Sequence, residues 1–240
     1  MLELNKIYCM DVLEGLKQLD DESIDLIITS PPYNKVGLNG ITKGGNWGKT
    51  IDYNGSTDND KMSEDEYQEW QIKILTECYR VLKNDGSLFY NHKNRIHKGE
   101  IVSPFMWLFR TPFKIKQELI WDRGSGHNIS KCRYIPSYEQ IFWLTKSMYP
   151  RFDRVAETKM KNDVWRIIPK KGTEHPAPFP VSLPDNIIPC VAQGERITVL
   201  DPFIGSGTVA VSAKKHGCDY IGFDKFQIYV DMANERITNM

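Results

Sequence analysis

The chain has 240 residues, and its 31 Lys and Arg side chains balance 31 Asp and Glu side chains, so the formal net charge is zero. This length predicts one domain with a full core, and the neutral balance excludes a global field that attracts polyanions, so any nucleic-acid surface must be local. The five cysteines are scattered without a Cys-x-x-Cys pair, and no apolar run has the length of a membrane span or a signal-peptide core. We therefore expect a cytoplasmic protein without a metal site, a disulfide framework or a membrane partner.

Strands and helices alternate through the first part of the chain. The apolar pattern predicts, in order, a strand over 4–9, a helix over 12–19, a strand over 23–29, a helix over 63–82 and a strand over 87–91. Consecutive apolar residues over 23–29 are typical of an inner strand of a parallel sheet. Ser63 and Glu66 have the spacing of a capping box and mark the start of the long helix. The polar segment 35–62 has the length of a functional or disordered loop.

The alternation continues to the end of the chain. The expected segments, in order, are a basic loop over 92–98, an apolar segment over 101–109, strands over 115–121 and 140–144, a helix over 183–192, a strand over 197–200, a helix over 209–216, a strand over 220–223 and a helix over 226–237. This order predicts an α/β fold, with a mostly parallel sheet and helices on both of its faces.

A glycine-rich turn separates the strand over 197–200 from the helix that follows. Gly205 and Gly207 let the backbone approach a ligand closely, and the next helix offers its amide groups and the positive end of its dipole. Asp224 closes the next strand, about 20 positions later, where Rossmann-like units bind the ribose hydroxyls of a nucleoside cofactor. The pattern therefore predicts a cofactor site, although Asp224 can also cap the last helix.

The segment Ser30-Pro31-Pro32-Tyr33 follows the inner strand over 23–29. Its two prolines remove two amide donors and hold Ser30 in an extended conformation. We expect a rigid corner that exposes hydroxyl and carbonyl acceptors beside an aromatic ring, which suits an amino group on a planar base. The alternative is a strand-ending turn whose tyrosine belongs to the core.

Together the two motifs resemble those of the DNA amino-methyltransferases, which modify exocyclic nitrogens of bases. The catalytic motif of that family reads (Asp/Asn/Ser)-Pro-Pro-(Tyr/Phe), as residues 30–33 do, and its cofactor motif contains Phe-x-Gly-x-Gly, as residues 203–207 do. The catalytic motif comes first, which is similar to the permuted β order of the family. The resemblance implies a Rossmann-like methyltransferase fold with circularly permuted motifs and S-adenosylmethionine as cofactor.

The resemblance also assigns roles to individual residues. The implied catalytic residues are Ser30, Pro31, Pro32 and Tyr33. The implied cofactor-binding residues are Asp11, Asp201, Phe203, Gly205, Ser206, Gly207, Thr208 and Asp224. Asp11 follows the first strand, where the family has an acidic contact to the cofactor adenine, and capping of the helix at Val12 is an equal alternative.

The implied reaction is methyl transfer to the exocyclic N4 of cytosine in double-stranded DNA. Ser30 favours cytosine, because family members with Asp there mostly methylate adenine; N6 of adenine is the alternative. Acceptors at the amine hydrogens can turn the lone pair towards the methyl group, so the reaction depends mainly on positioning. The base has to be flipped out of the duplex, with Tyr33 stacking on it. A catalytically silent cofactor- or DNA-binding homologue is the alternative from another functional class.

We expect a single methyltransferase domain over 1–240, with a catalytic half (1–148), a small target-recognition segment (149–174) and a cofactor-binding half (175–240). Basic residues are in excess between positions 151 and 171, although such a stretch is more often ordinary surface. The expected DNA contacts are Arg151, Arg154, Lys159, Lys161 and Arg166. A homodimer and a cognate restriction nuclease are further candidate partners.

Overall fold

A computed structural model describes residues 2–34, 62–124, 132–154, 159–169 and 180–240. Most of the predicted 35–62 loop lies outside these ranges. The described residues form an eight-stranded sheet and a two-stranded hairpin. The strands of the sheet are β1 (Lys6–Cys9), β2 (Ile24–Thr29), β3 (Leu82–His92), β6 (Lys114–Asp122), β7 (Tyr138–Thr145), β8 (Val164–Arg166), β9 (Thr198–Asp201) and β10 (Asp219–Asp224). The hairpin consists of β4 (Arg95–His97) and β5 (Glu100–Val102).

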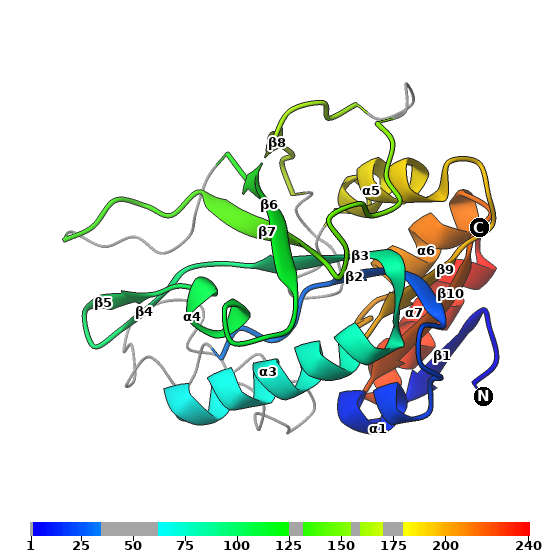
Figure 1. Cartoon of the computed structure of the whole chain (residues 1–240), viewed down its shortest axis with the longest axis horizontal. Helices are drawn as coiled ribbons and strands as arrows, with labels where there is room; N and C mark the ends of the chain where they lie inside the picture. The colour runs from blue at the N-terminus through cyan, green and yellow to red at the C-terminus, as the bar shows by residue number, and fades with distance from the viewer. Residues whose placement is uncertain (1, 35–61, 125–131, 155–158, 170–179) are drawn as a thin grey trace.

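The strand order of the sheet is β1-β10-β9-β2-β3-β7-β6-β8 (Figure 1). β7 runs antiparallel to both of its neighbours, β3 and β6, and all other neighbouring pairs are parallel. β2 and β9 lie side by side, with Leu26 opposite Val199 and Ile27 opposite Leu200. The two halves of the chain therefore join within one sheet, where the two strands that precede the motifs are neighbours.

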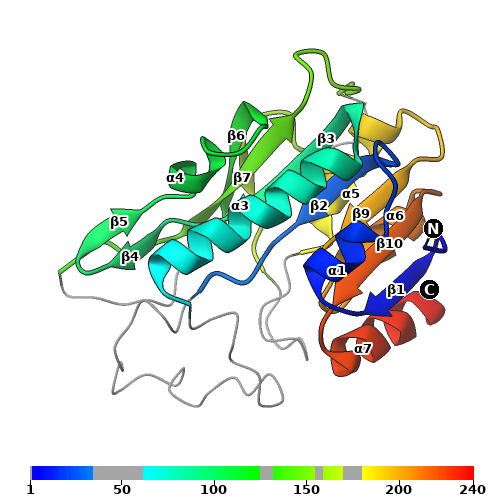
Figure 2. The same ribbon diagram turned by 60° about the horizontal axis from the view of Figure 1, so that its bottom comes forward.

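Helices cover both faces of the sheet, as predicted. The helices are α1 (Val12–Lys17), α3 (Glu64–Val81), α4 (Phe105–Leu108), α5 (Ser182–Ala192), α6 (Thr208–Lys215) and α7 (Gln227–Thr238). Figure 2 shows α1 and α3 in front of the sheet and α5 and α6 behind it. Neighbouring residues of β2 alternate between these layers: Ile27 packs in the core of α1, α3 and α4, and Leu26 and Ile28 pack in that of α5, α6 and α7.

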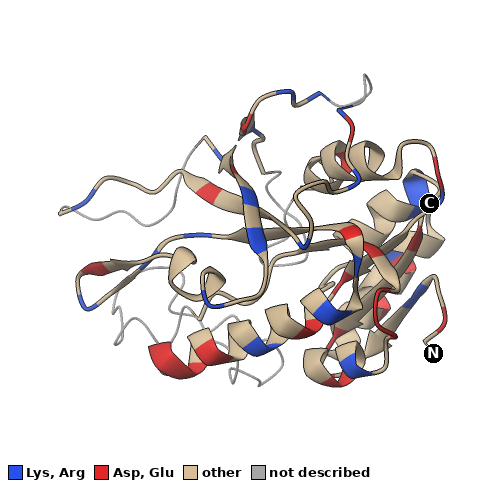
Figure 3. Ribbon diagram, in the orientation of Figure 1, with Lys and Arg blue, Asp and Glu red and all other residues tan. Residues whose placement is uncertain are grey.

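The start of α3 shows how local sequence sets an element boundary. Ser63 and Glu66 form the predicted capping box, with the Ser63 side chain accepting from the Glu66 amide and the Glu66 side chain accepting from the Ser63 amide. Acidic residues fill the first turn of the helix (Figure 3), where they face the positive end of the helix dipole. These groups satisfy amide donors that have no partner inside the helix.

Two expectations for the segment after α3 were wrong. The strand expected over 87–91 begins earlier, at Leu82, and its pairing with β2 shifts register between Leu82 and Ser87, which makes residues 83–86 an irregularity within the strand. The predicted basic loop over 92–98 contains β4 and two buried side chains, His92 and Arg95. Arg95 is buried because it forms an ion pair with Glu64 at 2.8 Å, which compensates its desolvation.

The stretch between β7 and α5 contains a strand that the sequence did not predict. β8 pairs in parallel with β6, and Trp165 in its middle is buried against the sheet. No described helix is long and apolar enough to cross a bilayer. The described residues also contain no group of three or more His, Cys, Asp or Glu side chains arranged to hold a metal ion.

Candidate active site

Four adjacent parallel strands end at one edge of the sheet and bring the predicted site residues together there. Asp11 follows β1, Asp224 ends β10, the glycine turn follows β9 and Ser30 follows β2. Parallel pairing places these carboxyl ends side by side, with Cys9 opposite Asp224 in the β1–β10 pair. Open α/β sheets bind ligands outside the carboxyl ends of their strands, so this edge is the candidate active site.

The Ser-Pro-Pro-Tyr corner is held from two directions. On the sheet side, the hydroxyl of Thr29 donates to the Oδ1 atom of the buried Asp201 at 2.8 Å and so links the corner to the glycine turn. On the helix side, the hydroxyl of Tyr67 in α3 donates to the Pro32 carbonyl at 2.6 Å and lies 2.8 Å from the Nε2 atom of His92. The corner is therefore rigid for a tertiary reason, in addition to its two prolines.

Tyr33 does not present an open ring for base stacking in this structure. It is only 8% exposed, and its ring centroid lies 4.5 Å from that of His92. Burial, followed by the charge of Glu139, raises the pKa of Tyr33 well above its ordinary value of 10.0. The alternative interpretation, a tyrosine of the core, describes the observed position of this ring.

A polar cluster that the sequence did not predict surrounds the Tyr33 hydroxyl. This hydroxyl lies 2.9 Å from Ser30 Oγ, donates to Glu139 Oε2 at 3.0 Å and accepts from Asn91 Nδ2 at 2.7 Å. Asn91 Nδ2 also donates to Glu139 Oε2 at 2.9 Å, and Arg123 pairs with Glu139 Oε1 at 2.7 Å. The side chains around Ser30 therefore come from or beside three adjacent strands: β3, β7 and β6.

The glycine turn has the backbone geometry that its sequence predicted. Gly205 has a φ of 48° and Gly207 a φ of 81°, which lie in the left-handed region that disfavours other residues. A Cβ atom at Gly207 would also lie 2.8 Å from the Cβ of Ala233 in α7. The Gly205 amide donates to Asp224 Oδ2 at 3.2 Å, so the turn and the acidic residue form one unit.

The two carboxyl groups beside this turn, those of Asp201 and Asp224, both have raised pKa values. Asp201 is 1% exposed, and burial raises its pKa to about 7, while hydrogen bonds from Thr29 and the Phe203 amide oppose the shift. Burial likewise raises the pKa of Asp224 to about 6. The Phe226 amide donates to Asp224 Oδ1 at 2.9 Å, so this carboxyl group also holds the backbone that leads into α7. Strongly shifted groups at a strand edge are typical of functional sites.

Comparison with known proteins identifies the family. A family model described as DNA methylase matches residues 24–235. Type II methyltransferase M2.DpnII of Streptococcus pneumoniae is 31% identical over 242 residues, which span 95% of this chain and 87% of that protein. The chain belongs to the DNA methylase family.

Further relatives span nearly the whole of this DNA methylase. Type II methyltransferase M.BglII of Bacillus subtilis is 29% identical and covers 96% of the chain and 68% of its own length. DNA adenine methyltransferase YhdJ of Escherichia coli strain K12 is 28% identical, with 95% of this chain and 80% of that protein covered.

Solved structures share the fold. PvuII DNA methyltransferase (cytosine-N4-specific) has a TM-score of 0.76 at 23% identity and covers 97% of this chain and 89% of its own. A putative DNA modification methylase from Thermus thermophilus, complexed with S-adenosyl-L-methionine, has a TM-score of 0.67 at 20% identity, with 98% and 93% covered. These matches confirm the predicted fold class: a mostly parallel sheet with helices, of the methyltransferase kind.

The remaining predicted cofactor residues of the DNA methylase have structural partners of their own. Asp11 caps α1, because its side chain accepts from the Leu13 amide at 2.8 Å, which confirms the capping alternative. Ser206 and Thr208 are buried and face Arg236, whose guanidinium donates to Ser206 Oγ at 3.0 Å and to Thr208 Oγ1 at 3.4 Å. Phe203 lies beside Trp70 of α3, with ring centroids 5.7 Å apart. Their contacts with a cofactor stay predictions.

The residues predicted to contact DNA lie in the segment around β8, far along the chain from Ser30. Four of them, Arg154, Lys159, Lys161 and Arg166, are exposed. Arg151 is partly buried and bound to its own chain, because its guanidinium donates to the Ala192 carbonyl at 2.7 Å and pairs with Glu195 at 2.9 Å. We therefore assign Arg151 an anchoring role; its contact with DNA stays a prediction.

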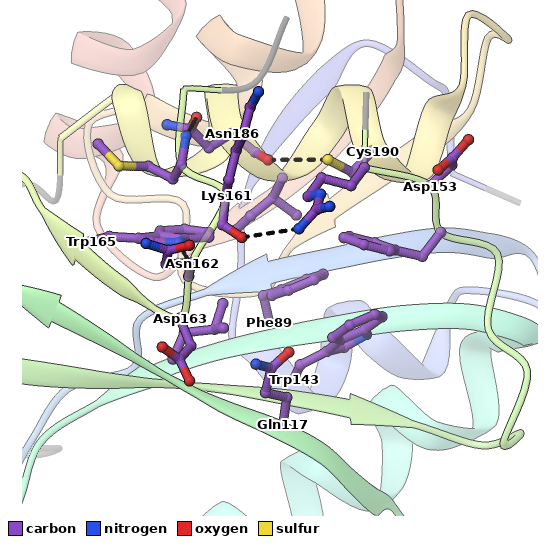
Figure 4. Close-up of a pocket in the computed structure, with 15 residues that line it drawn as sticks. Phe89, Gln117, Trp143, Asp153, Lys161, Asn162, Asp163, Trp165, Asn186 and Cys190 are labelled. Atoms are coloured by element: carbon purple, nitrogen blue, oxygen red, sulfur yellow. Dashed lines mark hydrogen bonds between the residues drawn. The ribbon is translucent and has the colours of Figure 1, made fainter. Parts of the chain in front are cut away.

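A cavity of about 450 Å³ lies between the sheet and the segment around β8 (Figure 4). Phe89 and Trp143 form its floor, and Lys161 and Asn186 lie on the opposite side. None of the residues that line it belongs to the corner, the glycine turn or the polar cluster. The cavity is thus distinct from the candidate active site.

The residues of the polar cluster that the sequence did not predict differ in how well the sequence could have indicated them. Asn91 comes near the end of an inner apolar strand, and open α/β sheets bind ligands outside the carboxyl ends of their strands, so this position is a signal that could have indicated Asn91. Glu139 stands at the start of its strand and reaches the same edge only because β7 is antiparallel. Strand direction is not readable from the apolar pattern, so no signal in the sequence indicated Glu139 or its partner Arg123.

Proposed function

We propose that this DNA methylase transfers a methyl group from S-adenosylmethionine to the exocyclic N4 of cytosine in double-stranded DNA. The observation that carries the proposal is the junction of the two motifs on neighbouring strands, where Thr29 Oγ1 donates to Asp201 Oδ1 at 2.8 Å. This contact sets the acceptor corner of β2 beside the glycine turn of β9. A donor and an acceptor of one transferred group need this adjacency, because in-line transfer depends mainly on positioning.

The residues at the glycine turn fit an adenosyl cofactor. The backbone at Gly205 and Gly207 is open to close approach, and Asp224 lies at the end of the next strand. Each Asp224 oxygen accepts one backbone amide, and a carboxylate oxygen has room for a second donor such as a ribose hydroxyl. We assign the ribose contact to Asp224 and the adenine contact to Asp11. The further proposed cofactor residues are Asp201, Phe203, Gly205, Ser206, Gly207 and Thr208.

The chemistry supplied by the cofactor, when bound, is an activated methyl group on a sulfonium. The solved relative that was complexed with S-adenosyl-L-methionine supports this assignment. The protein itself has to hold the target nitrogen. The Ser30 hydroxyl and the Pro31 carbonyl accept hydrogens of the amine, so that the nitrogen lone pair turns away from the ring. No shifted general base is needed, because the proton can leave after the nitrogen has become cationic.

The choice of cytosine rests on Ser30 and on one fold neighbour. Ser30 supplies an uncharged acceptor, and family members with Ser before the two prolines mostly methylate N4 of cytosine. The PvuII enzyme is cytosine-N4-specific by its description. Adenine N6 is the alternative, because the Escherichia coli relative is described as a DNA adenine methyltransferase. Both bases present an amino group next to a ring nitrogen, so the chemistry is common to the two.

Nucleoside mass spectrometry of DNA after reaction tests the proposal. Unmethylated bacterial DNA is incubated with the protein and labelled S-adenosylmethionine, digested and separated. We expect N4-methylcytosine. N6-methyladenine as the dominant product would overturn the cytosine assignment and leave the methyl transfer standing. A protein that binds the cofactor but labels no base would be the catalytically silent homologue.

We further propose that DNA is bound along residues 149–174, between the catalytic half (1–148) and the cofactor-binding half (175–240). The exposed residues that would contact phosphates are Arg154, Lys159, Lys161 and Arg166. A buried Tyr33 ring implies that a flipped base has to displace it or stack elsewhere. The Type II names of several relatives support a restriction context, in which a cognate nuclease and a second copy of the chain are the proposed partners.

A further inference from the structure

Asn91 has an unusual hydrogen-bonding position beside Ser30. It is only 6% exposed, and its Nδ2 atom contacts Tyr33 OH at 2.7 Å, Glu139 Oε2 at 2.9 Å and Ser30 Oγ at 3.3 Å. Its Oδ1 atom is buried and has no hydrogen-bond partner among the described residues. A buried acceptor without a partner costs free energy, and native proteins leave few of them, so this atom points to a missing ligand.

The orientation of the Asn91 amide follows from its neighbours. Glu139, when ionised, can only accept hydrogen bonds, and its second oxygen is held by Arg123 at 2.7 Å. Turning the amide over would place Asn91 Oδ1 against the Glu139 carboxylate, with acceptor facing acceptor. The Glu139–Arg123 pair therefore keeps Nδ2 on the inner side and leaves Oδ1 available.

We propose that Asn91 contacts the target base in the methyl transfer proposed above, on which this inference depends. Its Oδ1 atom accepts the amino hydrogen on the side of the ring nitrogen, while the acceptors at Ser30 and Pro31 hold the other amino hydrogen, and Nδ2 donates to the adjacent ring nitrogen. An amide side chain offers an acceptor and a donor side by side, and the amino and ring-nitrogen edge of either candidate base has the complementary pair.

A change of hydrogen-bond partner frees one Asn91 Nδ2 hydrogen for the base. Nδ2 carries two hydrogens but has three contacts, of which the one to Ser30 is the longest. One Nδ2 hydrogen can form a hydrogen bond with the ring nitrogen of the base, while the other keeps its hydrogen bond to Glu139. Glu139 and Arg123 are then positioning residues, since they orient the Asn91 amide without touching the base.

The test compares the wild type with Asn91→Leu and Asn91→Asp in methyl transfer from labelled S-adenosylmethionine to unmethylated bacterial DNA. Calorimetric cofactor affinity is measured on the same samples. We expect cofactor affinity at the wild-type level and a fall in kcat of roughly 5- to 150-fold, the equivalent of removing one bidentate interaction with a base. The matched control is Gln140→Leu, another buried polar residue of this sheet, which bonds to Glu118 and should keep wild-type kcat.

The Asn91→Asp variant adds a pH readout that a purely structural role would not produce. A protonated carboxyl group has one donor and one acceptor, like the amide, whereas the ionised form has acceptors only. The charged and titratable groups around this position include Glu139, Arg123, Tyr33, Lys93 and His92. We expect the ratio of variant to wild-type kcat to rise as the pH falls, with circular dichroism confirming that both proteins stay folded. The Asn91→Leu ratio should not change.

The outcomes separate the inference from the proposed function. Transfer by Asn91→Leu at the wild-type rate would overturn the contact and leave the proposed function intact. If that variant does not fold, a pH-independent ratio for Asn91→Asp has the same consequence. A wild-type protein that binds cofactor but methylates no DNA would overturn the proposed function, and the inference with it.

Discussion

Replacing Asp201 by Asn should change how the stability of this protein depends on pH. Asp201 is 1% exposed, and burial raises its pKa to about 7 from an ordinary value of 3.8. The charge of Asp224 contributes to the increase, while hydrogen bonds from Thr29 and the Phe203 amide act against it. The folded protein therefore binds the Asp201 proton more tightly than the unfolded chain does.

The sign and size of the effect follow from this difference. The contribution of Asp201 to stability is fully present below about pH 4 and is lost as the pH rises through its folded pKa of about 7. At 1.36 kcal/mol for each pKa unit, the loss between about pH 5 and about pH 8 is on the order of 2–3 kcal/mol. Asn has the shape of Asp and keeps the Oδ1 acceptor for Thr29, but it does not ionise.

Urea unfolding at a series of pH values measures this loss. The free energy of unfolding should fall less steeply for Asp201→Asn than for the wild type as the pH rises, so that the two curves diverge towards alkaline pH. Asp20→Asn, at an exposed position, is the matched control and should leave the wild-type curve unchanged. Parallel curves for Asp201→Asn and the wild type would refute the reasoning, because they would show that Asp201 has the same pKa in the folded and the unfolded protein.

Three other changes probe separate parts of the site. Tyr67→Phe removes the donor to the Pro32 carbonyl and should lower the unfolding free energy by about 1–3 kcal/mol in urea titrations, with a lower kcat and unchanged cofactor affinity. Asp224→Ala should weaken cofactor binding by about 1–3 kcal/mol in calorimetry, and unchanged affinity in a folded variant would contradict the ribose assignment. Reversing the charges of Arg154 and Lys161 should flatten the salt dependence of DNA binding by roughly one unit of slope for each phosphate interaction removed. Equal slopes for the variant and the wild type would mean that Arg154 and Lys161 do not contact the DNA phosphates.

Local sequence determined the elements that carry the two motifs. The Ser30-Pro31-Pro32-Tyr33 corner, the glycine turn at 205–207 and the capping box of α3 are each built by residues within a few positions of one another. Their conformations depend on proline and glycine geometry and on local side-chain caps, which act over short range. The parallel pairing of β2 with β9 then places Ser30 and Gly205 at the same edge of the sheet.

Tertiary structure alone decided what surrounds Ser30. The apolar pattern shows that a strand is buried, but it specifies neither its partners nor its direction. Antiparallel β7 brings Glu139 next to Asn91, and the Tyr33 ring lies against His92. Each of these contacts joins residues from different elements, and each reflects how buried polar groups find partners once the sheet has formed. Sequence therefore determined the two motifs of this DNA methylase, and packing decided which side chains meet the Ser30 hydroxyl.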